Sequence, residues 1–387
     1  MTFRSMRPIP GFLGVVIPAL VSAVLASAQA GPAGQPGQAP KPQMSEEVFK
    51  NVQVLKGIPV DEFMDTMGMF AAALSLNCVD CHTPESVGSW DRFADETPIK
   101  QRARRMITMV NTINKENFGG LRYVSCYTCH RGDTRPKIVP NLAAQYAEHV
   151  DDPNEVIINP VPGGPTVDQV FDKYFQALGG VQRLASVTSF TAKGTFIGFE
   201  TEQTKVPVDV FAKAPSQRAT VVHTRLGDSV RVYDGRQAWI ASPDRPVGLL
   251  PLTAGNLEGF KIDAILSFPA QLKSAFNQWR ITATAIDDHE VYVLQGTNSR
   301  QPPVNFYFDA ESGLLVRVLR FVDTAVGRVP TQIDFSDYRD VSGVKMPFRW
   351  ITTWTNGQAT TELSELQINV PIEAAKLSRP APAPRPQ

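Results

Sequence analysis

The sequence predicts a multidomain fold, in which a mainly α-helical domain is followed by a mainly antiparallel β (α+β) domain. In the first domain, residues 44–150, apolar residues recur at the three-to-four-residue spacing of amphipathic helices. In the second, residues 166–373, one amphipathic helix over 167–178 is followed by short alternating runs that turn residues separate. The change between the two patterns, at residues 151–165, predicts a linker.

Local signals mark where the expected helices begin and end. Ser45 is expected to cap a first short helix. The second helix is expected from residue 59 or 60 to about residue 76, because acidic residues in its first turn complement the helix dipole. The third is expected over residues 98–114, because a Thr-Pro pair opens it and two glycines follow its end. A short helix is expected around residues 142–149.

Strands are expected wherever β-branched and aromatic residues alternate with polar ones. The clearest runs are residues 208–211, 231–233, 290–294, 305–308 and 314–319. Hairpin turns are expected at Asp234-Gly235, Glu311-Ser312-Gly313 and Ser342-Gly343. A second helical piece is expected over residues 257–279. These elements predict a sheet of many antiparallel strands with one or two helices against it.

The chain divides into six predicted segments: a signal peptide (1–30), a disordered leader (31–43), the helical domain (44–150), the linker (151–165), the β-rich domain (166–373) and a Pro-rich tail (374–387). The signal peptide is inferred from a basic start, an apolar stretch over residues 11–25 and the small residues of Ala28-Gln29-Ala30. It predicts a periplasmic or otherwise exported protein. A retained membrane anchor is the alternative.

Composition limits the classes of partner. Lys and Arg number 38 and Asp and Glu number 38, so the chain has no net charge that would attract nucleic acid, and no nucleic-acid partner is expected. The apolar fraction of 43% is ordinary for globular proteins, so both domains can bury a core.

Two copies of one motif carry the strongest chemical signal. They are Cys78-Val79-Asp80-Cys81-His82 and Cys126-Tyr127-Thr128-Cys129-His130. In Cys-x-x-Cys-His, two thiols on one helical turn can add to the two vinyl groups of a porphyrin, and the His that follows lies under the iron. The two motifs use all four cysteines of the chain. They predict two covalently bound haem c groups, with His82 and His130 as axial iron ligands.

Three other sites could use the same cysteines. A four-cysteine zinc site would need two Cys-x-x-Cys pairs, but it would not need a His after each, and the gap between the pairs is long. A redox-active Cys-x-x-Cys pair would be expected at the junction of a strand and a helix, and neither motif lies in such a context. Two local disulfides would close strained rings. Repetition of all five residues behind an export signal favours haem c over each of these.

The sixth ligand of each iron is expected to be a methionine from the helix that precedes the motif. The first helix offers Met64, Met67 and Met69, and the second offers Met106 and Met109. A methionine on a helix is also a common core residue, so the choice among them stays open on these grounds. Helical periodicity favours Met67 and Met106, which share faces with other apolar residues.

A family resemblance narrows this choice. It rests on Asn51-Val52-Gln53-Val54-Leu55, Glu62-Phe63 with Thr66-Met67, Ala103-Arg104-Arg105-Met106, and the run Cys126-Tyr127-Thr128-Cys129-His130-Arg131-Gly132. Through these stretches, residues 51–140 resemble one two-haem half of the cytochrome c subunit of photosynthetic reaction centres. The resemblance implies that Met67 pairs with His82, and that Met106 pairs with His130.

The same resemblance implies an iron-containing electron carrier, not an enzyme, that exchanges electrons with partner proteins. The partner could be a membrane-bound photosynthetic reaction centre or a respiratory complex, because the family protein holds four haems and this chain has two motifs. A dihaem enzyme of the peroxidase kind is the first alternative, and it would need one iron with an open face. A lipid- or lipoprotein-binding protein with an auxiliary haem domain is the second.

Two further expectations concern the surroundings of the haems and the second domain. Arg105 and Arg131, close to the motifs, are expected to pair with haem propionates. The helix-then-strands pattern from residue 166 loosely resembles the curved-sheet carriers of outer-membrane lipoprotein and lipid transport. That resemblance implies a docking domain, or a cleft for a hydrophobic ligand.

Overall fold

The computed structural model describes residues 41–147, 152, 154, 155, 157, 162–299 and 301–384. Residues 41–387 form one compact unit. The predicted signal peptide lies outside the described residues, as does most of the predicted leader. None of the described helices combines the length and the apolar character needed to cross a bilayer.

The N-terminal helices agree closely with the sequence expectations. They are α1 (Ser45–Val48), α2 (Val60–Leu74), α3 (Cys78–Cys81), α4 (Pro98–Asn117), α5 (Cys126–His130) and α6 (Leu142–Gln145), with 3-10 turns η1 (Pro84–Gly88) and η2 (Trp90–Ala94). The expected cap of the first helix is wrong. Ser45 lies inside α1, where its buried hydroxyl donates to the carbonyl oxygen of Leu55 at 2.6 Å, and Met44 occupies the cap position.

The remaining helices belong to the sheet region. They are α7 (Val167–Ala177), α8 (Val181–Ser186) and α9 (Ala254–Leu266), with 3-10 turns η3 (Phe199–Thr201), η4 (Pro269–Ala275) and η5 (Ala374–Leu377). The expected helical piece over 257–279 is wrong at both ends. The α-helix starts three residues earlier and stops before Pro269, which has no N–H to donate, and Trp279 already belongs to a strand.

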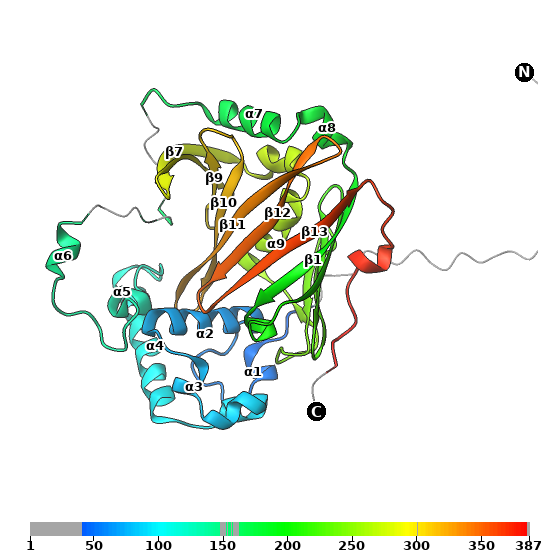
Figure 1. Ribbon diagram of the computed structural model, residues 1–387. Coiled ribbons are helices and arrows are strands. Elements are labelled where there is room, and N and C mark those ends of the chain that lie inside the picture. The colour runs from blue at the N-terminus through cyan, green and yellow to red at the C-terminus, as the bar shows by residue number, and fades with distance from the viewer. Residues whose placement is uncertain are drawn as a thin grey trace, which may run out of the picture. The chain divides into compact units, whose positions relative to one another are not determined.

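Thirteen antiparallel strands among the described residues form one sheet (Figure 1). They are β1 (Ser189–Gly198), β2 (Val206–Lys213), β3 (Gln217–Thr224), β4 (Gly227–Tyr233), β5 (Ala238–Ala241), β6 (Leu250–Pro251), β7 (Gln278–Ile286), β8 (His289–Thr297), β9 (Val304–Asp309), β10 (Leu315–Thr324), β11 (Gly327–Val341), β12 (Val344–Trp354) and β13 (Gly357–Ile368). Their order is β6-β5-β4-β3-β2-β1-β13-β12-β11-β10-β9-β8-β7. Pairing of β1 with β13 therefore joins two runs of hairpins, and the three predicted turns lie within them.

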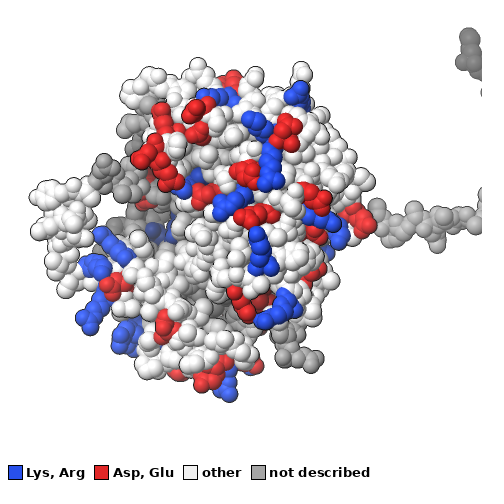
Figure 2. Space-filling view, viewed as in Figure 1, with Lys and Arg blue, Asp and Glu red and all other residues white. Residues whose placement is uncertain are grey.

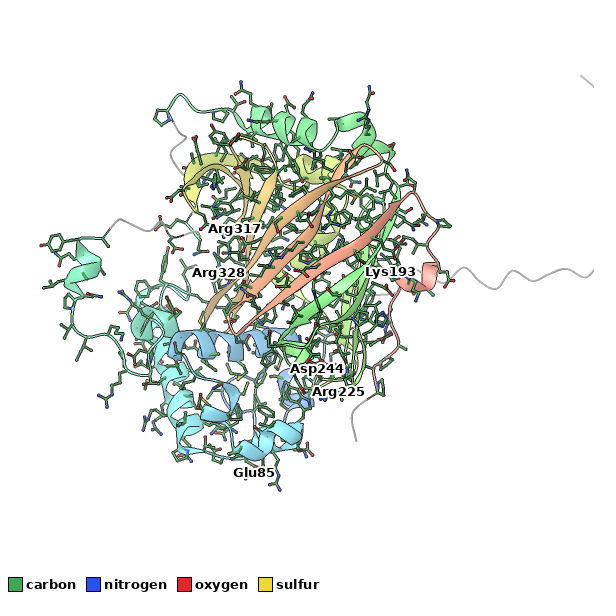
Figure 3. The ribbon with its side chains drawn as sticks, in the orientation of Figure 1. Glu85, Lys193, Arg225, Asp244, Arg317 and Arg328 are labelled. Atoms are coloured by element: carbon green, nitrogen blue, oxygen red, sulfur yellow. The ribbon has the colours of Figure 1, made fainter. Side chains whose placement is uncertain are left out.

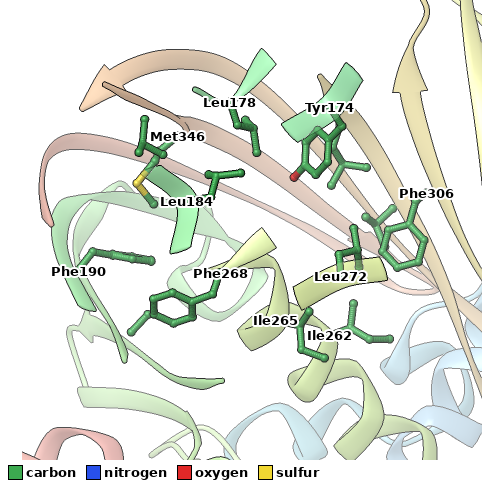
Figure 4. Close-up of a cluster of buried hydrophobic side chains, with 14 of the residues drawn as sticks. Tyr174, Leu178, Leu184, Phe190, Ile262, Ile265, Phe268, Leu272, Phe306 and Met346 are labelled. Carbon is green, nitrogen blue, oxygen red and sulfur yellow. The ribbon is translucent and has the colours of Figure 1, made fainter. Parts of the chain in front are cut away.

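One face of this curved sheet is filled by the chain's own side chains. Residues of α7, α8, α9 and η4 pack against residues of the strands in a single apolar cluster (Figure 4). Phe171, Leu272 and Phe306 have no exposed surface. Burying each of them contributes about 1.5–3 kcal/mol through the hydrophobic effect, so this cluster accounts for much of the stability of the sheet region.

A second apolar cluster joins the N-terminal helices to the sheet. This junction cluster contains Leu55, Met69, Ala73, Ile107, Cys126, Val322, Val326 and Val329. Helix α2 lies against β10 and β11, whose connecting turn ends at Gly327. A Cβ atom at Gly327 would lie 2.7 Å from Met69 Cε and 2.7 Å from Ser125 Cβ. The close approach of the hairpin to α2 and α5 therefore requires glycine at this position.

Polar groups at the same junction hold α2 to the start of α9. The backbone N–H of Thr253 donates to Asp61 Oδ2 at 2.7 Å, and its hydroxyl donates to the same carboxylate at 3.0 Å. Asn256 donates to Asp65 Oδ2 at 2.6 Å. Burial raises the pKa of Asp61, and it raises the pKa of Asp65 to about 7. These carboxylates are buried only because the sheet region supplies donors to them.

Described residues of the predicted linker are also bound to the sheet. The buried Gln295 side chain accepts from the N–H of Ile157 at 2.9 Å and donates to the carbonyl of Glu155 at 2.8 Å. Arg328 donates to Asn154 Oδ1 at 2.6 Å. The segment between the two predicted domains is thus tied to β8 and β11. The predicted domain boundaries remain a sequence-based proposal.

Candidate functional site

The first motif forms α3, a single helical turn. The carboxylate of Asp80 accepts from the backbone N–H of Asn77 at 2.7 Å and closes the start of the turn. Cys78 is exposed and Cys81 is half-buried, and the two do not form a disulfide with each other. The hydroxyl of Thr97, which caps α4, donates to the carbonyl of Cys81 at 2.8 Å. This bond fixes the first motif to the start of the next long helix.

The imidazole of His82 is oriented by a backbone carbonyl. Its Nδ1 lies 3.1 Å from the carbonyl oxygen of Phe93. A carbonyl oxygen can only accept, so Nδ1 carries the hydrogen and the lone pair is on Nε2. Burial and the positive charge of Lys100 lower the pKa of His82, which favours the neutral ring. A neutral imidazole with its Nε2 lone pair available is the form that binds iron.

Neighbouring groups support this arrangement. Lys100 Nζ donates to the carbonyl oxygens of Phe93 and Asp95, at 2.9 and 2.6 Å. The ring of Phe93 contacts the ring of His82, with centroids 4.8 Å apart, and it stacks on Trp90 at 5.1 Å. The sequence does not reveal the part played by Lys100, because its contacts run to backbone carbonyls.

The second motif forms α5, and a backbone carbonyl orients its histidine as in the first motif. Ser125 and Thr128 form a capping box at its start. His130 Nδ1 lies 2.9 Å from the carbonyl oxygen of Asp133, so this ring too holds its hydrogen on Nδ1 and leaves Nε2 to accept or bind. Cys126 is buried in the junction cluster, and burial raises the pKa of its thiol to about 11. Cys129 is exposed.

A buried asparagine that sequence reasoning missed holds the second motif to α4. Asn114 accepts from the N–H of Val124 at 2.9 Å and donates to the carbonyl of the same residue at 2.7 Å. It lies on the face of α4 that also buries Ile107 and Val110. A polar residue on an apolar helical face was the available signal, since a buried amide must find partners.

The structure separates the candidate methionines. Met69 is buried against the β10–β11 hairpin, which makes it a core residue. Met67 is partly buried at the edge of the same cluster, which also contains Cys126. Met106 is 37% exposed and Met109 is 43% exposed, on α4 beside the buried Ile107. Helix α2 packs against α5, and Met67 packs against the cluster that contains Cys126, so the described contacts place Met67 beside the second motif.

The candidate propionate partners lie at the surface. Arg105 and Arg131 are exposed, and neither forms an ion pair with a described residue. The neighbouring Arg104 is committed elsewhere, because it binds both carboxylate oxygens of Glu96 at 2.8 and 2.9 Å. Arg105 and Arg131 therefore keep their guanidinium groups available for an anion.

Exposed apolar side chains are frequent in the stretch of sequence that holds both motifs. They include Val79, Trp90, Ile99, Met106, Met109, Leu121, Tyr123 and Tyr127. Exposed apolar side chains of this size are candidates for contacts with a ligand or a partner. No three His, Cys, Asp or Glu side chains of the described residues converge on a point that could hold a metal ion, so a four-cysteine zinc site is not formed.

Comparison with known families agrees with this geometry. Residues 14–155 match the photosynthetic reaction centre cytochrome C subunit family. This stretch, the cytochrome-like region, includes both motifs and every candidate axial ligand. The match confirms the family resemblance of the N-terminal helices, and the family is one of haem-binding electron carriers.

Curated relatives cover the same region. The reaction centre cytochrome c subunit of Thermochromatium tepidum is 38% identical over 97 residues, which are 24% of this chain and 23% of that protein. The subunit of Rubrivivax gelatinosus is 30% identical over 122 residues, 29% of this chain and 31% of that protein. The chain thus spans about a quarter of the length of the curated relatives it matches.

Solved structures similar to this chain cover about half of it. A LolA superfamily protein from Nitrosomonas europaea has a TM-score of 0.36 and 13% identity, with 54% of this chain and 96% of that chain covered. A putative outer membrane lipoprotein-sorting protein domain from Vibrio parahaemolyticus has a TM-score of 0.34 and 9% identity, with 52% and 95% covered.

Proposed function

We propose that this protein is an exported dihaem c-type cytochrome that transfers electrons one at a time between partner proteins. One observation carries the proposal. In both Cys-x-x-Cys-His motifs the imidazole Nδ1 is hydrogen-bonded to a backbone carbonyl, at 3.1 Å for His82 and 2.9 Å for His130. Each ring thus keeps Nε2 for a ligand, and each follows directly on two cysteines that form no disulfide, the donor set that haem c requires.

Each residue has a defined part in this proposal. Cys78 and Cys81 would hold one haem and Cys126 and Cys129 the other, and when bound each haem supplies an iron that cycles between Fe(III) and Fe(II). The carbonyls of Phe93 and Asp133 orient the two histidines. Met67 and Met106 would cap the opposite faces of the irons, and a soft thioether favours Fe(II) and raises the potential.

If His82 with Met67 and His130 with Met106 were to hold the two irons, neither iron would keep a free face, which favours a carrier over an enzyme. A peroxidase-like reaction needs a face where a substrate oxygen can bind. Phe93 contacts the ring of His82 and stacks on Trp90, and apolar groups beside an iron ligand would raise the potential by limiting access of water.

The location and partners follow from the family and the predicted signal segment. A periplasmic position, with a membrane-bound reaction centre or respiratory complex as partner, is the proposal that fits both. The chain spans only about a quarter of the length of its relatives, and it has two motifs. We therefore propose that it acts as a single two-haem relay.

The sheet region is proposed to act as a scaffold that docks the cytochrome-like region. An apolar cavity among α7, α8, η4 and β12 has a volume of about 40 Å³. Ligand pockets for small molecules are usually about 300–1,000 Å³, so this cavity is too small for a lipid. The contacts of β10 and β11 with α2, and the packing of Cys126 of α5 with Val322, Val326 and Val329, support the scaffold role.

The proposal is tested by the mass of the purified protein. The full chain, exported by a host with a complete haem c maturation system, should keep its colour after acid–acetone extraction. Its intact mass should exceed that of the processed polypeptide by two haem groups, because thioether bonds survive the extraction. Pigment that is lost into the acetone, or a mass equal to that of the polypeptide, would refute it.

A further inference from the structure

The cytochrome-like region has opposite charges at its two motifs. Residues 78–96, from the first motif to the end of η2, contain five Asp or Glu residues and one Arg. Residues 98–137, from α4 to just beyond the second motif, contain nine Lys or Arg residues and two Asp or Glu residues, a formal charge of +7. The chain as a whole is neutral, so this is a local separation of charge.

The acidic end is largely neutralised by ion pairs. Asp91 pairs with Lys50 at 3.1 Å, Asp95 pairs with Arg92 at 3.4 Å, and Glu96 pairs with Arg104 at 2.8 Å. Glu85 stands at this end of the molecule (Figure 3). Because Asp91, Asp95 and Glu96 are paired with cations, the stretch around the first motif offers little free negative charge to a partner.

The basic end keeps its charge. Exposed cations on α4, at the C-cap of α5 and in the loop after it form what we call the α4–α5 basic surface: Arg102, Arg105, Arg131, Arg135 and Lys137. Only Lys137 forms an ion pair with a described residue, Asp133. Figure 2 shows Lys and Arg side chains gathered on the part of the molecule that α4 and α5 occupy in Figure 1.

Apolar groups and the second motif lie at the same place. Cys129 is exposed, and Tyr123 and Tyr127 are 68% and 52% exposed. Exposed aromatic side chains within a charged rim are typical of protein interfaces. The propionates of one haem carry about two negative charges, which leaves residues 98–137 strongly positive.

We propose that the α4–α5 basic surface binds an acidic redox protein, and that electrons pass to or from this partner through the haem of the second motif. The inference rests on the proposed function. Complementary charge steers encounter and raises the rate of association, and it does so most at low ionic strength. The partner is therefore recognised by its acidic surface, and the first motif is left for the exchange with the second partner.

The test measures electron transfer from the fully reduced holoprotein to oxidised plastocyanin, an acidic blue-copper protein, in a stopped-flow instrument. The variant is Arg102→Glu with Arg135→Glu, two exposed positions that are not proposed to touch a haem. The matched control is Lys193→Glu with Arg225→Glu, which makes the same change in net charge on the sheet, away from α4 (Figure 3).

The second-order rate constant of the wild type should fall as salt is added, and the α4–α5 variant should react about tenfold more slowly at low ionic strength. The control should stay within about twofold of the wild type. Equal slowing of both variants, or a wild-type rate that does not respond to salt, would overturn the inference.

Two further readouts separate the causes of failure. If the wild type shows no c-type haem spectrum, the proposed function itself fails. If both variants show normal reversible haem spectra while the plastocyanin rates are unchanged, only the docking inference fails. Loss of binding to vesicles of anionic phospholipid in the α4–α5 variant, without a change in these rates, would also overturn it and assign the surface to a membrane.

Discussion

Replacing either proposed axial methionine should lower the potential of one haem and leave the other almost unchanged. In Met67→Ala and in Met106→Ala, one iron loses the thioether that favours Fe(II), so its midpoint potential should fall by on the order of 100 mV. Covalent attachment should persist, because the cysteines are untouched. Spectroelectrochemical titration of the full chain measures both potentials at once.

The matched controls are other methionines of the same helices. Met64→Ala on α2 and Met109→Ala on α4 remove a side chain of the same size, and Met109 is 43% exposed. Both potentials should stay within about 20 mV of the wild type in these controls, since no iron ligand is lost. Unchanged potentials in both Met67→Ala and Met106→Ala, or equal shifts in the controls, would show that the ligands are assigned wrongly.

Removing the cysteines of one motif should leave a protein with a single haem. Cys78→Ala with Cys81→Ala, and separately Cys126→Ala with Cys129→Ala, should each reduce the covalent haem from two per chain to one. A pyridine haemochrome assay on a known amount of protein measures this ratio. A ratio that falls to zero in either variant, or stays at two, would contradict independent attachment.

The two cysteine variants should differ in stability. Cys126 is buried in the junction cluster with Met69 and Val322, whereas Cys78 is exposed. The second variant should therefore lower the thermal midpoint more than the first, because it opens a cavity where the helices meet the sheet.

The Met variants and the cysteine variants together also identify which methionine and which motif serve the same haem. The haem whose potential shifts in Met67→Ala should be the one that is missing when Cys78 and Cys81 are replaced.

Local signals predicted the elements well. Helix α2 was expected over residues 59 or 60 to 76 and spans Val60–Leu74, and α4 was expected over 98–114 and spans Pro98–Asn117. The strands expected at 231–233 and 305–308 lie within β4 and β9. These elements follow from periodicity and from end signals, which a single stretch of sequence contains. The α-helix α9 ends at Leu266, before Pro269, and a proline within the expected range is itself a local signal for such an end.

The contacts that assemble the site could not be read in the same way. The hydrogen bonds from Thr253 to Asp61 join residues 192 positions apart, and no local pattern connects them. The packing of Val326 against α2 and Cys126 depends on how a hairpin tip meets a helix. The carbonyls of Phe93 and Asp133 that orient the histidines belong to the backbone, so no side chain in the sequence indicates this role. The motifs predict haem chemistry, and the hydrogen bonds that orient their histidines come from the structure.

The optical and near-infrared spectrum of the fully oxidised wild type tests the central claim most directly. Two irons held between imidazole and thioether should both be low-spin, with the near-infrared band of methionine-bound Fe(III) at an intensity that corresponds to two haems per chain. A high-spin haem would contradict this account, since it would place an open coordination face on one iron and favour a dihaem enzyme.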